Sequence, residues 1–170
     1  MAVAKKTAET EHFWRAFLRT TETPECPYDV VSFADSPKLA TQLMELVLCG
    51  QKRATAALLR QFGAEGEPLP VIGGHVVLVD GDGNPGAIWR TKELRLGPLV
   101  SVDDAFAWDE GEGDRTRAWW IDAHRAFFGR LAEQGGFRMH DHIETGFERF
   151  EIVWPPDIAD PQFRTLPFSN

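Results

Sequence analysis

Residues 46–58, Leu-Val-Leu-Cys-Gly-Gln-Lys-Arg-Ala-Thr-Ala-Ala-Leu, join a predicted helix to a second apolar run. The helix begins at Ser36-Pro37 and ends at Gly50, because glycine readily accepts the left-handed backbone that follows a helix. Lys52 and Thr55 come next. An extended strand sends side chains three residues apart to opposite faces, so this pair cooperates only if the chain turns between them. The stretch therefore predicts a candidate site at a junction between rigid elements.

The rest of the chain mixes helices and strands without a regular alternation. Apolar residues at helical spacing predict helices near residues 11–19, 36–49, 101–107 and 115–133. Alternating or β-branched runs predict strands at 30–35, 75–79, 87–94 and 147–154. Ser101 with Asp104, and then Asp114, are the expected N-caps of the last two helices. This order favours an α+β fold, with helices packed outside an antiparallel or mixed sheet or a small barrel.

The length predicts a single domain over residues 1–170. We expect a frayed start in residues 1–10 and a proline-rich tail in residues 155–170. The glycines of residues 80–86 formally match the G-x-G-x-x-G pattern of dinucleotide-binding proteins. Pro85 lies inside this match, and a predicted strand follows it instead of a helix. The segment is therefore predicted to be a hairpin turn.

Charge and composition exclude several classes of function. The net charge of −8 argues against passive binding of duplex DNA, which needs a basic surface. No apolar run is long enough to span a membrane, and the first ten residues lack the apolar region of a signal peptide. Cys26 and Cys49 give neither a metal-binding spacing nor a disulfide framework. We therefore expect a cytoplasmic protein without a membrane partner.

The acidic stretch Asp109-Glu-Gly-Glu-Gly-Asp114 is the second candidate for chemistry. Its two glycines allow a tight fold in which several carboxylates face one point. Such crowding raises some carboxyl pKa values, which suits acid/base work, or it collects a divalent cation. The alternative is that Asp114 caps a helix while the other carboxylates are solvated.

The histidines give no metal site. His140 and His142, with His124 upstream, lack a further ligand at a familiar spacing, so neither a metal nor another cofactor is expected. His124 is expected to pack beside the apolar face of its helix. Four aromatic residues of that helix are expected in the core more than in a base-stacking surface: Trp119, Trp120, Phe127 and Phe128.

Several motifs occur in an order that is typical of one family. They are Ser32-Phe-Ala-Asp-Ser-Pro37, Gly50-Gln-Lys-Arg-Ala-Thr-Ala-Ala-Leu58, Glu67-Pro-Leu-Pro-Val-Ile-Gly73, Glu110-Gly-Glu-Gly-Asp114, Trp120 with His124 and Phe127-Phe128, and Glu148-Arg-Phe150. Over about residues 12–154 this pattern resembles the ASCH-domain family, specifically its bacterial single-domain subgroup. The resemblance implies a PUA-like fold, a small β-barrel flanked by helices, with a cleft for RNA or nucleoside ligands.

The resemblance also implies a reaction. Smaller relatives are amidohydrolases that deacetylate 4-acetylcytidine with a lysine, a threonine and a glutamate, and the matching positions here are Lys52, Thr55 and Glu110. By resemblance Thr55 would attack the acyl carbon, Lys52 would take and return its proton, and Glu110 would orient or help protonate the lysine. Five further residues are predicted to bind the substrate: Phe33, Arg53, Glu112, Arg115 and Glu148.

Two departures and two alternatives accompany this prediction. Arg53 stands where the subgroup typically has threonine, and Ala34 stands where glycine is common. An arginine at the mouth of the site would favour a phosphate-bearing ligand, whereas one pointing into solvent would not. The alternatives are an RNA-binding or ribonuclease module, which arginines such as Arg90 would serve, and a non-catalytic sensor of nucleotide ligands. The expected partner is a nucleoside, a nucleotide or single-stranded RNA.

Overall fold

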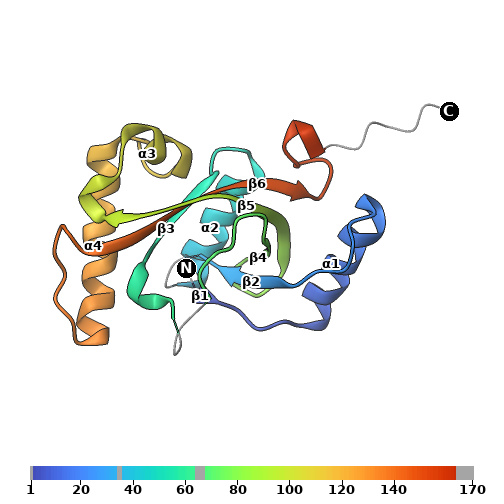
Figure 1. The fold of residues 1–170 in the computed structure, drawn as a ribbon, viewed down its shortest axis with the longest axis horizontal. Helices are drawn as coiled ribbons and strands as arrows, with labels where there is room; N and C mark the ends of the chain where they lie inside the picture. The colour runs from blue at the N-terminus through green and yellow to red at the C-terminus, as the bar shows by residue number, and fades with distance from the viewer. Residues whose placement is uncertain (1, 34–35, 64–67, 164–170) are drawn as a thin grey trace.

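A curled, mixed β-sheet forms the centre of the computed structural model, which describes residues 2–33, 36–63 and 68–163 (Figure 1). The strand order is β1-β2-β4-β5-β6-β3. The strands are β1 Ala2–Val3, β2 Tyr28–Ser32, β3 Ala54–Leu58, β4 His75–Val79, β5 Pro85–Pro98 and β6 Glu144–Trp154. Strands β2 and β4 are parallel, and the other neighbours are antiparallel. The short strand β3 therefore lies at one edge of the sheet, beside the long strand β6.

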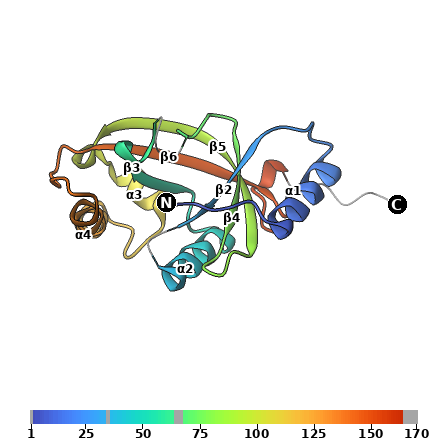
Figure 2. The ribbon, with the colours of Figure 1, turned by 90° about the horizontal axis from the view of Figure 1, so that it is seen from below.

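Four helices flank this sheet: α1 Ala8–Thr21, α2 Pro37–Leu48, α3 Asp104–Glu110 and α4 Arg117–Gly135. Helices α4 and α1 lie at opposite ends of the molecule, with α2 between them (Figures 1 and 2). Short 3-10 helices cover Leu59–Gln61, Leu99–Ser101 and Pro161–Phe163. The mixed sheet with helices outside it confirms the predicted α+β class. Within the described ranges, no helix is both long and apolar enough to cross a membrane.

The helices bury their apolar faces in three clusters along the sheet. Helix α1 contributes Trp14 and Phe17 to one cluster, and α2 contributes Leu43 and Val47 to a second. Helices α3 and α4 form the third cluster with β3, which contains Ala56, Leu58, Phe106, Trp120 and Phe128. Burying one such large side chain stabilises the fold by about 1.5–3 kcal/mol. Strand β3 thus lies between the cluster of α2 and the cluster of α4.

The first residues are more ordered than the sequence predicted. Helix α1 begins at Ala8, because the Thr7 and Thr10 side chains each accept a hydrogen bond from the other residue's backbone N–H. Ala2 and Val3 pair with β2. The expectation of a frayed start over residues 1–10 is therefore wrong for the described part, residues 2–10.

Two predicted helix caps are displaced along the chain. Helix α3 is capped by Asp103, whose carboxylate accepts a hydrogen bond from the Phe106 N–H at 2.7 Å, while Ser101 lies in a 3-10 turn. Helix α4 is capped by Thr116, whose hydroxyl accepts a hydrogen bond from the Trp119 N–H. Asp114, the expected cap, binds Thr116 instead. Helix α3 also continues to Glu110, inside the acidic stretch and beyond the predicted end at residue 107.

Candidate functional site

The segment between α2 and β3 carries Lys52 into the interior. Gly50 adopts a left-handed backbone with φ of +86° directly after the helix. The Lys52 N–H then donates to the Leu46 carbonyl at 2.9 Å, and the Arg53 N–H donates to the Asp109 carbonyl at 2.7 Å. Only 1% of the Lys52 side chain is exposed. The chain therefore turns after Gly50, as cooperation between Lys52 and Thr55 requires.

The connection between α3 and α4 docks directly on this segment. Gly111 ends α3 with φ of +72°, and a Cβ added there would lie 2.4 Å from the Gln51 carbonyl oxygen. The Gln51 side chain in turn donates from Nε2 to the Gly111 carbonyl at 2.5 Å. A side chain at position 111 would separate the two backbones. Glycine therefore permits the contact that brings the acidic stretch to Lys52.

Two glutamates share the Lys52 ammonium. The Lys52 Nζ donates to Glu112 Oε1 at 2.6 Å and to the Glu110 carbonyl at 3.4 Å. It also lies 4.0 Å from Glu110 Oε1. The Glu110 side chain is 1% exposed. A buried ammonium is stable only with such partners, because burial of a lone charge costs several kcal/mol.

Glu110 also contacts two residues of α4. Its Oε2 accepts a hydrogen bond from Trp120 Nε1 at 2.5 Å and lies 3.5 Å from His124 Nε2. The His124 ring stacks on Trp120 with 3.7 Å between ring centroids, and its Nδ1 lies 3.0 Å from the Trp120 carbonyl. A carbonyl only accepts, so Nδ1 carries a proton, and Nε2 is the ring nitrogen that faces Glu110. His124 is packed, as predicted, but it also contacts a candidate catalytic residue. Its position one turn after Trp120 was the sequence signal for this second role.

Burial and charge divide the protons among these groups. Burial lowers the pKa of Lys52, but attraction to Glu110 and Glu112 outweighs burial, so the pKa is raised overall. Burial raises the pKa of Glu110, and the opposing attraction to Lys52 and His124 does not reverse this. Burial also acts to raise the pKa of Glu112, but the charge and hydrogen bond of Lys52 lower it overall. Lys52 and Glu112 therefore form an ion pair, and Glu110 is the carboxyl that holds a proton more readily.

A cavity of about 380 Å³ lies between α2, β3 and α4. Its polar lining consists of Lys52, Thr55, Glu110, Glu112 and His124, with Arg130. Its apolar lining includes Phe33, Leu39 and Leu43 on the side of α2, and Trp119, Ala123 and Phe127 from α4. A concave, mostly apolar site with a few convergent polar groups is typical of small-molecule binding. The cavity thus brings together Lys52, Thr55, Glu110, Glu112 and Phe33 among the residues predicted from the sequence.

Arg53 lies outside the lining of this cavity. Its Nε donates to Asp160 Oδ1 at 3.0 Å, and its Nη1 donates to the carbonyls of Val47 and Lys52. Asp160 also accepts a hydrogen bond from the Ile152 N–H at 2.9 Å. The guanidinium therefore joins α2, β6 and the segment after β6. This arrangement gives Arg53 a structural partner and does not direct it toward a ligand phosphate.

Replacing Arg53 with glutamine is expected to lower the free energy of unfolding by about 1–3 kcal/mol, because hydrogen bonds made by a charged group are lost. Urea unfolding of the wild type and of Arg53→Gln measures this change. Arg60→Gln is the matched control, because Arg60 stacks on Phe137 at the other end of β3. If Arg53→Gln instead weakened the binding of phosphate-bearing nucleotides and left the stability unchanged, Arg53 would be assigned to ligand binding.

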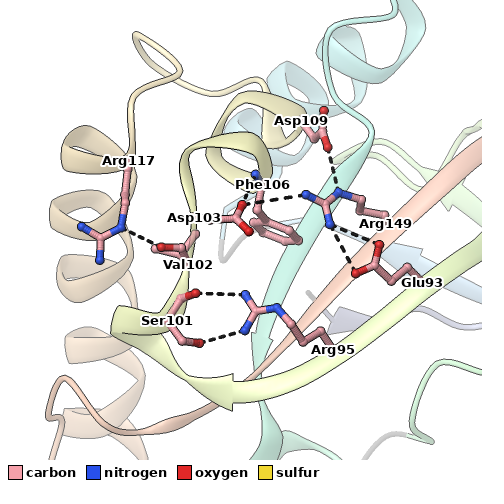
Figure 3. A network of polar contacts seen from close by, with 9 residues as sticks. All are labelled: Glu93, Arg95, Ser101, Val102, Asp103, Phe106, Asp109, Arg117 and Arg149. Atoms are coloured by element: carbon pink, nitrogen blue, oxygen red, sulfur yellow. Dashed lines mark hydrogen bonds and ion pairs between the residues drawn. The ribbon is translucent and has the colours of Figure 1, made fainter.

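The carboxylates of the acidic stretch do not all face one point. Asp109 Oδ2 accepts a hydrogen bond from Arg149 Nε at 2.8 Å, and the Arg149 guanidinium also pairs with Glu93 and lies 4.0 Å from Asp103 (Figure 3). Only the two glutamates of the stretch meet at Lys52. In the described ranges, no group of three or more acidic, histidine or cysteine residues is arranged to hold a metal ion.

Arg115 also lies away from the cavity lining. It donates from Nε and Nη2 to the Trp108 carbonyl, and its guanidinium lies 3.7 Å from the Trp108 ring centroid. Trp108 is 57% exposed and Trp119, at the cavity, is 37% exposed. Helices α3 and α4 therefore each carry an exposed tryptophan near the loop that joins them. The prediction that Trp119 lies in the core is therefore wrong.

Glu148 lies beside Thr55 in the sheet, on the neighbouring strand, and does not line the main cavity. The two residues are direct cross-strand partners on β6 and β3, so their side chains project from the same face. Glu148 Oε1 accepts hydrogen bonds from Thr91 Oγ1 at 2.6 Å and from Trp89 Nε1 at 3.2 Å. The residue is 3% exposed. Burial raises the pKa of Glu148 to about 7, although both hydrogen bonds act to lower it.

This raised pKa predicts a pH-dependent stability. The folded protein holds the Glu148 proton up to about pH 7, whereas the ordinary pKa is 4.5. The unfolded chain loses that proton first, so the contribution of Glu148 to stability is largest below pH 4.5 and falls as the pH rises to 7. Glu148→Gln cannot titrate. Wild-type stability relative to this variant should therefore fall by about 3 kcal/mol across that window, measured by urea unfolding. A constant difference between the two proteins would contradict the shift.

Comparisons with known proteins give a consistent result. The family model described as the ASCH domain matches residues 29–154. The crystal structure of an ASCH domain from Lactobacillus crispatus JV V101 is similar, with a TM-score of 0.80 and 25% identity over 89% of this chain and 98% of that one. Protein EF3133 from Enterococcus faecalis V583 has a TM-score of 0.78 and 31% identity over 85% of this chain and 88% of that one. A search of curated proteins gave no match. The structural similarity confirms the predicted PUA-like fold.

Proposed function

The chain belongs to the ASCH domain family, and on this basis we propose that it is a small hydrolase that removes acyl groups from modified nucleosides or nucleotides, free or within RNA. One observation carries the proposal. Lys52, Thr55 and Glu110, which match the reacting residues of deacetylating relatives, line one cavity of about 380 Å³. A nucleobase fits the chemistry of this cavity, because its walls are mostly apolar and aromatic while its polar groups converge.

The geometry supports distinct roles for the three residues. Thr55 is the nucleophile that attacks the acyl carbon. The Lys52 ammonium, held charged between two carboxylates, stabilises the negative charge that develops on the acyl oxygen. Uptake of the Thr55 proton by Lys52, the role implied by resemblance, would need a neutral amine. The charges of Glu110 and Glu112 oppose that state.

Glu110 and His124 form the second functional pair of the proposed site. Glu110 orients Lys52, and its raised pKa suits a group that shares a proton with the neighbouring imidazole. Both side chains line the cavity. We assign to this pair the stabilisation of the leaving amine in the ligand.

Acetate release from 4-acetylcytidine, assayed together with a panel of acylated nucleosides and nucleotides, tests the proposal. We expect release from at least one member, in step with formation of the free amine. Including the matching 5′-phosphates in the panel tests the phosphate preference that Arg53 suggested. If the protein releases an acyl group from none of these compounds, the proposed hydrolase function is rejected.

RNA binding is the second candidate function, favoured by the exposed tryptophans Trp108 and Trp119. Aromatic side chains of this kind stack unpaired bases, at about 1–3 kcal/mol per base. Titration with short single-stranded RNA at low salt should then show binding that weakens as salt is added and that Trp119→Ala reduces. No association at low salt would eliminate this candidate.

A further inference from the structure

Thr55 requires a proton acceptor that the three matched residues do not provide. A threonine hydroxyl is a weak nucleophile until a neighbouring base takes its proton. Lys52 is occupied by its ion pair with Glu112, at 2.6 Å. Glu110 is occupied by Lys52, Trp120 and His124. The base must therefore come from another element that contacts Thr55.

Strand β6 presents one candidate directly opposite Thr55. Glu148 is the register partner of Thr55, and the Cβ atoms of such cross-strand pairs lie about 4.5–5.5 Å apart. Both hydrogen bonds to its carboxylate end on Oε1, which leaves Oε2 without a hydrogen bond to any described residue. Glu148 and Thr55 also line a second, small cavity of about 10 Å³. Among the described residues that line the two cavities, only Thr55 lines both.

We propose that the Glu148 carboxylate is the general base that takes the hydroxyl proton of Thr55 from the side of strand β6, while the ligand approaches from the main cavity. This inference rests on the proposed hydrolase function and deepens it. The distance between cross-strand partners allows a carboxylate to reach a hydroxyl directly or through one water molecule, for which the small cavity has about the necessary volume.

The chemical steps balance with water as the only co-reactant. As the Thr55 oxygen bonds to the acyl carbon, its proton moves to Glu148. The C–N bond then breaks as the Glu110–His124 pair gives a proton to the leaving nitrogen, which yields a free amine and an ester on Thr55. A water molecule in the main cavity attacks the ester carbon and gives one proton back to that pair. The C–O bond to Thr55 breaks, the threonine oxygen regains its proton from Glu148, and a carboxylic acid leaves.

The surroundings of Glu148 suit a base that works near neutral pH. Among the residues that the structure describes, the groups that face it are uncharged: Thr55 from β3, Trp89, Thr91 and Leu94 from β5, and Phe62 and Pro70 from the segment after β3. No charged side chain is among the causes of its shifted pKa. The Thr91 hydrogen bond favours the ionised carboxylate.

Acylation of Thr55 by a small β-lactone, followed by mass spectrometry, tests the base independently of the natural ligand. In the wild type we expect the rate to rise with pH around 7. Glu148→Gln keeps an acceptor oxygen for Thr91 and Trp89 but cannot take a proton, so the rate should fall by about 10²-fold or more. Thr91→Val removes a hydrogen bond that lowers the pKa, so the midpoint of the pH profile should move upward.

Glu151→Gln is the matched control for these measurements. Glu151 lies on the same strand, is also buried, and pairs with Arg90. Thr55 of the Glu151→Gln variant should be acylated at the wild-type rate. The thermal unfolding midpoint of each variant verifies that it is folded. Equal rates in the wild type and Glu148→Gln, or no acylation of wild-type Thr55 at any pH, would overturn the role of Glu148 as general base. Acylation that depends on Glu148, without turnover of any acylated nucleoside, would reject the proposed substrate but not the role of Glu148.

Discussion

Replacing Lys52 with methionine should reduce acyl-nucleoside turnover by about 10²–10³-fold or more and lower the free energy of unfolding by about 3–5 kcal/mol. Methionine has a similar length and fits the space, but it carries no charge. Glu112 would lose its 2.6 Å partner, and Glu110 would lose the cation that lies 4.0 Å away. The variant therefore leaves the buried Glu110 and the partly buried Glu112 without their cation. Acetate release and urea unfolding at neutral pH measure the two effects.

The double variant Lys52→Met/Glu112→Gln separates stability from catalysis. Removal of the second charge should restore part of the lost stability, because the partly buried residue 112 then carries no uncompensated charge. Turnover should stay low, since the cation that stabilises the developing negative charge is still missing. Wild-type turnover in Lys52→Met would show that Lys52 has no chemical role. A double variant less stable than the single one would contradict the ion pair as the source of the lost stability.

Replacing Thr55 with valine should reduce turnover by about 10⁴-fold or more while the protein remains folded. Valine exchanges the hydroxyl for a methyl group of similar size, and β-branched residues suit a strand. The Thr55 hydroxyl makes no hydrogen bond to another described residue, so its loss leaves no unpaired partner there. Acetate release, with thermal unfolding as a check on the fold, measures the result.

Thr55→Ser supplies the control for the nucleophile. Serine keeps the hydroxyl and should retain a measurable part of the turnover, whereas valine should retain almost none. Similar turnover in Thr55→Val and the wild type would assign the attack to a water molecule or to another residue. The ligand would then use Thr55 only as part of the cavity wall.

Local patterns in the sequence predicted much of this architecture. Helix α2, with its cap at Ser36 and its end before Gly50, follows the prediction closely, and β4 covers residues 75–79 as expected. Each of these elements has one dominant signal, such as a capping hydroxyl or a β-branched run. The caps of α3 and α4 were misassigned because several acceptors stand close together, and docking on the neighbouring segment decides among them.

The site could be predicted only in part. The residues Lys52, Thr55 and Glu110 were found by their motifs, but the partners that control their protonation were not. The contact of Gly111 with Gln51 and the register of β3 against β6 join segments far apart in the chain. Spacing along the sequence carries no information on such contacts. For the same reason, the sequence did not reveal that Arg53, considered there as a phosphate-binding residue, pairs with Asp160.

A crystal structure of Thr55→Val with 4-acetylcytidine is the most direct test of the proposed site, because this variant should bind the ligand without consuming it. We expect the cytosine ring of the ligand to lie between α2 and α4, with the acyl oxygen in contact with the Lys52 ammonium and the acyl carbon facing position 55. Binding of the ligand in the separate cleft lined by Cys26 and His75, or an empty cavity at saturating ligand, would contradict the assignment of the cavity between α2, β3 and α4 as the functional site.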